Sequence, residues 1–326
     1  MTHGDAVTSP HEERAARRDR QAGCLYGLAV GDALGAAVEF EPPGTFEPVT
    51  GYRQGTAHPI GPGAWTDDTS MALALAASLA DGWDLADQLR RYVQWSRDGA
   101  YSVIDRCFDI GGTTARSLRA FETTGSVTNS PGEFDSGNGS IMRLAPVAIR
   151  YLAAPDRELA EKASQSSQTT HASRLARGGC IVMAALLKGL MEGHDRAVVV
   201  QPAWVRERVG RQAAGDALAD EGLLKDEEFL ADDDVIEAVF AEDRGPVGSG
   251  FVLASLHAAV WAFRGAASFE EAVLAAVNLG DDSDTTGAVC GQLAGACWGL
   301  SGIPQPLIDG LQRREMLERA LEPLLG

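Results

Sequence analysis

Apolar residues recur three and four positions apart along most of this chain, the spacing that places them on one face of an α-helix. In Ala-rich sequence this pattern predicts helices over 14–36, 66–81, 84–97, 140–153, 157–168, 173–192, 251–263, 269–278 and 285–300. Strict alternation of apolar and polar residues, which is typical of strands, is almost absent. We therefore predict an all-α fold, a compact orthogonal array of many helices.

Three segments depart from the helical pattern. Residues 1–20 are polar, and we expect a disordered leader there, followed by a single domain over 21–326. Residues 41–64 carry five prolines and five glycines, which predicts a long ordered loop of the kind that often serves function. Residues 216–243 hold twelve acids and one lysine. We interpret them as solvated surface helices, with an acidic docking surface as the less favoured alternative.

Charge and cysteine content narrow the class of protein. The 326 residues carry a net charge of −18, which argues against nucleic acid as a partner because phosphate contacts need clustered Lys and Arg. The cysteines number five, without a CxxC pair, so we expect reduced thiols in a cytoplasmic protein. We find no signal peptide and no membrane-spanning run, and we expect a monomer.

Two clusters of adjacent acids precede apolar helices more than 200 residues apart. The first lies in TDDTS and the second in GDDSDTT, where Asp281, Asp282 and Asp284 are the only charged residues between Ala272 and Ile308. One acid in the first turn of a helix suits the helix dipole, but these groups exceed what a cap requires. Burying such charges without a counter-ion is costly.

If the two helix starts meet in space, their carboxylates and hydroxyls form a ring of oxygen atoms that repels itself unless it holds a cation. Oxygen ligands suit Mg²⁺ or Mn²⁺ rather than Zn²⁺, which prefers His and Cys. The number of carboxylates calls for two divalent cations. We therefore predict a binuclear metal site at helix N-termini.

Glycines and isolated polar residues mark further candidate positions. Gly23, Gly27, Gly31 and Gly35 are spaced by four and share one helix face, which predicts close packing against a partner helix. Glu39 stands at the end of that helix, where an acid opposes the dipole.

The GNG turn at residues 137–139 leads into a helix, and its N–H groups suit a phosphate or ribose, although a plain turn with an N-cap is the favoured interpretation of this motif alone. Residues 111–114, Gly-Gly-Thr-Thr, have the same ambiguity. His171 lies alone between two predicted helices, where a histidine is more often structural than functional.

Several motifs together resemble the ADP-ribosylglycohydrolase family, which includes the dinitrogenase reductase-activating glycohydrolases. They are GLAVGDALGAAVEF, TDDTSMALALAASL, GNGSIMR, THAS and GDDSDTTGAVCGQLAGA, in this order. The resemblance runs from about Gln21 to the C-terminus. It implies an all-α fold, a binuclear Mg²⁺ or Mn²⁺ site, and hydrolysis of the bond between ADP-ribose and a modified side chain.

By the same resemblance, each motif suggests a role for its residues. The implied metal ligands are Thr66, Asp67, Asp68, Asp282, Asp284 and Thr285. The implied substrate-binding residues are Gly137, Asn138, Gly139 and His171. Glu39 and Asp135 are the candidates for the catalytic carboxylate, whereas the role of Asp281 stays open.

The substrate expected from this resemblance is an ADP-ribosylated protein or other ADP-ribose conjugate. Asp135 precedes Asn138 by three residues and would pair with a guanidinium, so we expect ADP-ribosyl-arginine. A serine, nucleic-acid or small-molecule linkage is the alternative. Isoprenoid synthases also bind diphosphate through Asp-rich motifs, but their DDxxD spacing is broken by Met71 and Thr285. A non-catalytic ADP-ribose-binding or structural relative would carry degenerate metal motifs, and here both motifs are intact.

Overall fold

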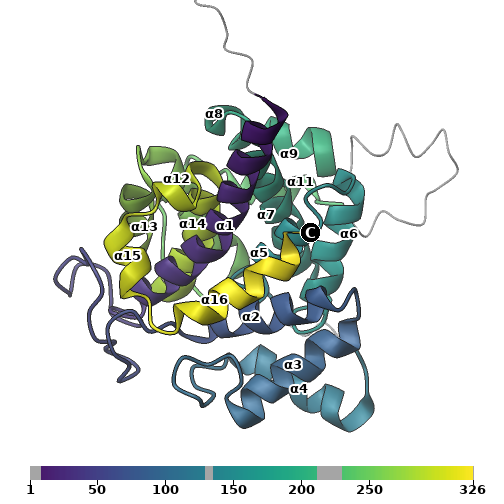
Figure 1. Cartoon of the computed structure of the whole chain (residues 1–326), viewed down its shortest axis with the longest axis vertical. Coiled ribbons are helices and arrows are strands. Elements are labelled where there is room, and N and C mark those ends of the chain that lie inside the picture. Colours follow the sequence, from purple (N-terminus) through teal and green to yellow (C-terminus); the bar gives the residue numbers. More distant parts are fainter. Residues whose placement is uncertain (1–8, 129–134, 211–229, 326) are drawn as a thin grey trace, which may run out of the picture.

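The computed structural model describes residues 9–128, 135–210 and 230–325, and their regular backbone is helical (Figure 1). The α-helices are α1 (Pro10–Gly35), α2 (Asp67–Ala80), α3 (Leu85–Asp98), α4 (Gly112–Thr124), α5 (Ala145–Arg150), α6 (Asp156–Gln168), α7 (Arg174–Glu192), α8 (Arg196–Val199), α9 (Pro202–Val209), α11 (Asp233–Val239), α12 (Val252–Gly265), α13 (Phe269–Val277), α14 (Ser283–Trp298), α15 (Gln305–Gly310) and α16 (Arg314–Leu321). Short 3₁₀ turns cover Leu300–Gly302 and Glu322–Leu324. Strand pairing in the described part is limited to two isolated bridges. The prediction of an all-α fold is confirmed.

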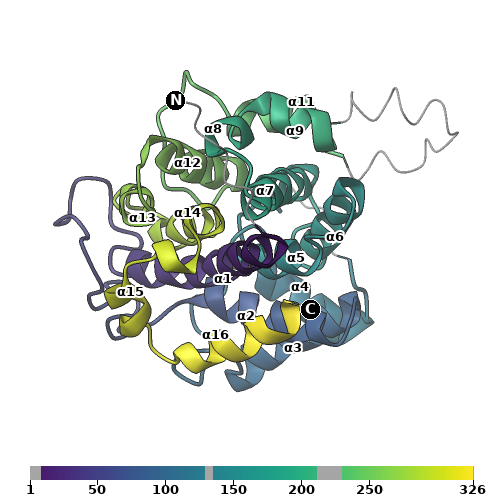
Figure 2. The same ribbon diagram turned by 45° about the horizontal axis from the view of Figure 1, so that its top comes forward.

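Helices α1 and α14 lie side by side at the centre of the molecule, and the other helices surround them (Figures 1 and 2). Helices α12 and α13 cover one side of this pair, and α7 packs against α14, α12 and α6. Helix α2 contacts α1, α5 and α16, while α3 packs on the outside of α2. The two central helices therefore join the beginning of the chain to its last third.

Glycines let the backbones of α1 and α14 touch. A Cβ atom placed on Gly27 would lie 2.1 Å from the carbonyl oxygen of Gly291, and one on Gly31 would lie 2.0 Å from that of Gly287. Gly23 opposes Gly295 in the same way. The predicted close-packed partner helix is thus α14, and this contact fixes where the start of α14 lies relative to the end of α1.

The N-terminal segment differs from the expected leader. Helix α1 begins at Pro10, because Ser9 and Glu12 form reciprocal capping hydrogen bonds between side chain and backbone. Residues 10–20 are therefore helical, whereas the rest of the expected leader, residues 1–8, lies outside the described residues. Residues 211–229 of the acidic segment also lie outside them, but its end forms α11, where Asp234 pairs with Arg174.

Two further differences concern the turn-forming residues. The helix predicted over 140–153 begins only at Ala145, because the GNG turn continues as turns up to Arg143. Helix α4 was not predicted, since its N-cap Gly111 and first residue Gly112 are poor helix formers. The expected loop over 41–64 is confirmed as ordered and non-helical.

All five cysteines are described, and none forms a disulfide. Among the described helices, none combines the length and the apolar character needed to cross a bilayer.

Candidate metal and substrate site

The two acidic helix starts meet beside the centre of the fold. Oγ1 of Thr66, at the start of α2, lies 3.1 Å from Oδ2 of Asp284, across 218 residues of chain. Thr285 donates from its Oγ1 to Oδ2 of Asp68 at 3.4 Å. Carboxylate oxygens of Asp67, Asp68 and Asp284 all lie within 4.8 Å of one another. We call these three residues the oxygen cluster.

The oxygen cluster is buried and electrostatically unbalanced. Its carboxylates are at most 7% exposed, and no Lys or Arg in the described residues forms an ion pair with them. Burial raises the pKa of all three well above the ordinary value, and repulsion from neighbouring carboxylates raises it further. Within the described ranges, Oδ1 of Asp68 and Oδ1 of Asp284 are buried without a hydrogen-bond partner. Unpaired oxygens at this spacing fit hard divalent cations such as Mg²⁺ or Mn²⁺.

Asp32 of α1 supports the start of α2 from behind. Its carboxylate is fully buried and accepts four hydrogen bonds, from the backbone N–H and hydroxyl groups of Thr66 and Thr69, at 2.6–3.0 Å. Burial raises the pKa of Asp32 to about 6, and these hydrogen bonds oppose the rise. Asp32 thereby fixes Thr66, a proposed ligand, without lining the cavity.

Asp281 and Asp282 are adjacent but make different contacts. Asp282 Oδ2 accepts a hydrogen bond of 2.8 Å from the side-chain amide of Asn138, and Asp282 lines the cavity described below. Asp281 acts through its backbone: it has a φ of 51°, its N–H donates to Glu41, and its carbonyl accepts from Phe40. This pair of hydrogen bonds ties the segment after α1 to the start of α14.

A cavity of about 350 Å³ adjoins the oxygen cluster. Asp67, Asp284 and Thr285 line it together with Glu39 and the first turn of α4, residues 111–114. The GNG turn and His171 form another part of the lining. The N–H groups at the start of α4 suit an anionic ligand in a protein whose net charge is −18.

The GNG turn packs tightly on His171. A Cβ atom on Gly139 would lie 2.7 Å from Cε1 of His171, so a side chain does not fit there. His171 is buried and its Nδ1 lies 2.9 Å from the hydroxyl of Thr170. Burial lowers the pKa of His171 to about 3, and the positive charges of Arg143 and Arg116 contribute. The imidazole is thus a neutral polar group on the cavity lining.

Asp135 lies beside the site rather than on the cavity lining. It is 4% exposed, and its Oδ1 accepts a hydrogen bond of 3.0 Å from the guanidinium of Arg116, on α4. The same guanidinium also donates to Thr113. Asp135 therefore already holds an arginine of its own chain over the first turn of α4.

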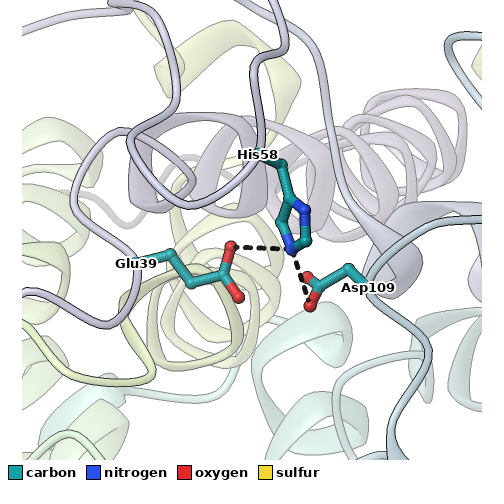
Figure 3. Close-up of side chains that lie close together, drawn as sticks. All are labelled: Glu39, His58 and Asp109. Atoms are coloured by element: carbon teal, nitrogen blue, oxygen red, sulfur yellow. Dashed lines mark ion pairs between the residues drawn. The ribbon is translucent and has the colours of Figure 1, made fainter.

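Glu39, His58 and Asp109 form a second group at the cavity (Figure 3). Burial raises the pKa of Glu39 to about 9, and the nearby charge of Asp109 adds to the rise. Burial also raises the pKa of Asp109, whereas His58 opposes that rise. Sequence reasoning identified Glu39 but missed the other two. Asp109 lies two residues before the Gly-Gly turn that begins α4, and His58 lies in the Pro/Gly loop. These neighbouring features were the available signals.

Comparison with known proteins shows a similarity over nearly the whole chain. The family model described as ADP-ribosylglycohydrolase matches residues 13–326. An ADP-ribosylarginine hydrolase Tri1 of Serratia proteamaculans is 35% identical over 94% of this chain and 79% of its own. An ADP-ribosyl-[dinitrogen reductase] glycohydrolase of Rhodospirillum rubrum is 29% identical, over 94% of this chain and 96% of its own. A solved ADP-ribosylglycohydrolase-related protein complex superimposes with a TM-score of 0.79 at 37% identity, covering 95% and 98%.

Proposed function

We infer that this chain, which belongs to the ADP-ribosylglycohydrolase family and is a hydrolytic enzyme, removes ADP-ribose from modified arginine side chains with the help of two divalent cations. The arginine linkage is favoured because relatives at 35% and 36% identity are named ADP-ribosylarginine hydrolases. Proteins named ADP-ribosylhydrolase ARH3 are only 23–26% identical.

One observation carries the metal dependence: the oxygen cluster is buried with unpaired oxygens, and no cationic side chain of the described residues forms an ion pair with it. We assign Thr66, Asp67, Asp68, Asp282, Asp284 and Thr285 as the residues that hold the cations. The cations would supply positive charge that binds ribose hydroxyls and orients a water molecule. Asn138 positions Asp282 through its amide, and Asp32 positions Thr66.

The remaining residues of the cavity can bind the ADP-ribose group and transfer protons at the bond that is cleaved. The N–H groups of residues 111–114 and of the GNG turn would receive the diphosphate and ribose. Glu39 lines the cavity and burial raises its pKa, so we propose that it donates a proton to the leaving guanidine nitrogen. Burial raises the pKa of Asp109, but its ion pair with His58 opposes that rise, so we propose Asp109 as the group that accepts a proton from the attacking water.

Asp135 was a candidate for the catalytic carboxylate, but its contacts favour a different role. Because its carboxylate pairs with Arg116, we propose that it holds Arg116 near the diphosphate rather than acting as the base. Its expected pairing with the guanidinium of the substrate would require that ion pair to break.

The test is a panel of arginine-, serine- and nucleic-acid-linked ADP-ribose substrates, assayed in Mn²⁺ or Mg²⁺. We expect release of ADP-ribose from the arginine linkage, lost in Asp284→Asn and kept in Asp98→Asn, a change on the exposed side of α3. Release from another linkage alone would refute the arginine assignment. Binding of ADP-ribose without any turnover would show a non-catalytic relative.

A further inference from the structure

Glu39, His58 and Asp109, which we call the His58 cluster, bring three separate segments to one point (Figure 3). Glu39 follows the end of α1, His58 belongs to the 41–64 loop, and Asp109 precedes α4. Nε2 of His58 lies 3.1 Å from Oδ1 of Asp109 and 3.8 Å from Oε2 of Glu39. All three ligand atoms lie within 4.8 Å of one another. None of these atoms belongs to the oxygen cluster.

Two of the three atoms have no hydrogen-bond partner. In the described part of the chain, Oε2 of Glu39 and Nε2 of His58 are both buried without a hydrogen bond, although Nε2 forms the 3.1 Å ion pair with Asp109. Glu39 as a whole is only 3% exposed. Figure 3 shows both atoms turned toward the space between the residues. Buried polar atoms are normally hydrogen-bonded, so a buried carboxylate oxygen of Glu39 without a hydrogen bond, facing an imidazole nitrogen that lies between two carboxylates, calls for a ligand between them.

We propose that the His58 cluster binds one divalent transition-metal ion, with Zn²⁺ as the representative, through one imidazole nitrogen and two carboxylate oxygens. Zn²⁺ bonds of about 2.0–2.2 Å in tetrahedral geometry place neighbouring ligand atoms roughly 3.3–3.6 Å apart. The observed separations of 3.1 and 3.8 Å lie on either side of that spacing. The two carboxylate charges balance the charge of the ion.

The imidazole distinguishes this site from the oxygen cluster. Nitrogen ligands favour Zn²⁺ and similar transition ions, whereas Mg²⁺ prefers oxygen ligands alone. The two clusters therefore select different cations. Mg²⁺ is expected to leave the His58 cluster open to Zn²⁺.

The surrounding backbone holds the cluster in place before any ion arrives. The carbonyl of His58 accepts a hydrogen bond of 2.7 Å from the N–H of Ile60, which closes a tight turn in the loop. The imidazole packs edge-on against Phe108, the neighbour of Asp109, with ring centres 5.3 Å apart. The hydroxyl of Thr56 reaches the carbonyl of Glu39 at 3.5 Å. The ligands thus need little reorganisation to bind.

Occupation of this site would affect the cavity. Glu39 and Asp109 line it, so an ion that holds both removes them from a substrate. Zn²⁺ would then antagonise binding of ADP-ribose. This consequence rests on the proposed function, whereas binding of the ion does not.

The experiment is calorimetric titration of Zn²⁺ into the full chain in millimolar Mg²⁺, repeated with Co²⁺ as an absorbing probe. The variants are His58→Gln and Glu39→Gln, and the control is His194→Gln, since His194 is an exposed histidine that lies 3.5 Å from Glu192. Thermal melting of each variant without added metal establishes that it folds.

We expect one equivalent of Zn²⁺ that Mg²⁺ does not displace. It should be lost in His58→Gln and Glu39→Gln and kept in His194→Gln. Co²⁺ should give visible absorption bands that vanish with the same two variants. Equal Zn²⁺ binding by wild type and His58→Gln would overturn the proposal, as would full displacement by Mg²⁺. Because binding is read directly, an absence of hydrolase activity would count only against the proposed function.

Discussion

The contact between α1 and α14 yields a prediction about Gly31→Ala. The added methyl group would lie 2.0 Å from the carbonyl oxygen of Gly287, where ordinary contact begins near 3.4 Å. The contact would have to lengthen by about 1.4 Å, from 2.0 to 3.4 Å, and the backbones must move apart because the nearest atoms are backbone atoms of Gly287 and Ala288 rather than side chains. Overpacking typically costs about 1–3 kcal/mol, and a backbone clash belongs at the upper end.

The expected loss of stability follows from two opposing contributions. Alanine has a helix propensity about 1 kcal/mol better than glycine, so the net loss in free energy of unfolding is about 2 kcal/mol. An unfolding entropy of about 2.1 cal/mol/K per residue over 326 residues converts this loss to a fall in Tm of roughly 3 °C. Stabilisation by Mn²⁺ should also shrink, since separating the helices displaces Asp284 at the start of α14 from Asp68 on α2.

The assay is thermal unfolding with and without Mn²⁺, followed by circular dichroism. Gly265→Ala is the matched control, because it makes the same change at the end of α12 where no atom lies within 4 Å of the new methyl group. It should melt at or slightly above the wild-type temperature. If Gly31→Ala melts like this control and responds equally to Mn²⁺, the reasoning about backbone contact is refuted.

Three further predictions concern charge and backbone. In the metal-free chain, burial raises the pKa of Glu39 from 4.5 to about 9 and that of Asp32 from 3.8 to about 6. The folded state therefore binds more protons than the unfolded state, and the free energy of unfolding should fall as pH rises from 5 to 8. Melting across this range should show that slope, flattened by saturating Mn²⁺, and a rise in metal-free Tm with pH would contradict it. Asp281→Gly should leave stability in urea unchanged, whereas Asp281→Ala should lose about 1 kcal/mol because φ is 51°; equal losses would exclude a backbone role. His171, with a pKa lowered to about 3, should show no NMR titration of its ring protons between pH 5 and 8, and a midpoint near 6.5 would exclude its burial as described.

Much of the oxygen cluster was predictable, because local sequence carries its signal. Asp67 and Asp284 each stand in a charge-poor apolar context at a helix start, where capping alone does not explain them. The glycine spacing in α1 likewise required a close neighbour, although it did not identify α14.

The rest depended on contacts between distant segments. Asp109 and His58 are single residues in loops, and nothing local indicates that both approach Glu39. Asp135 looked available for a substrate because the sequence does not reveal that Arg116, on α4, already pairs with it.

The pairing of α1 with α14 also sets the order of events during synthesis. Helix α1 leaves the ribosome with a glycine-lined face whose partner ends at Trp298, more than 260 residues later. At about 5–20 residues per second this delay is on the order of tens of seconds. During that time the nascent chain contains Asp67 and Asp68 of the oxygen cluster but lacks Asp284 and helix α14. A protein truncated before residue 283 should therefore expose the glycine-lined face of α1 to aggregation and to chaperones.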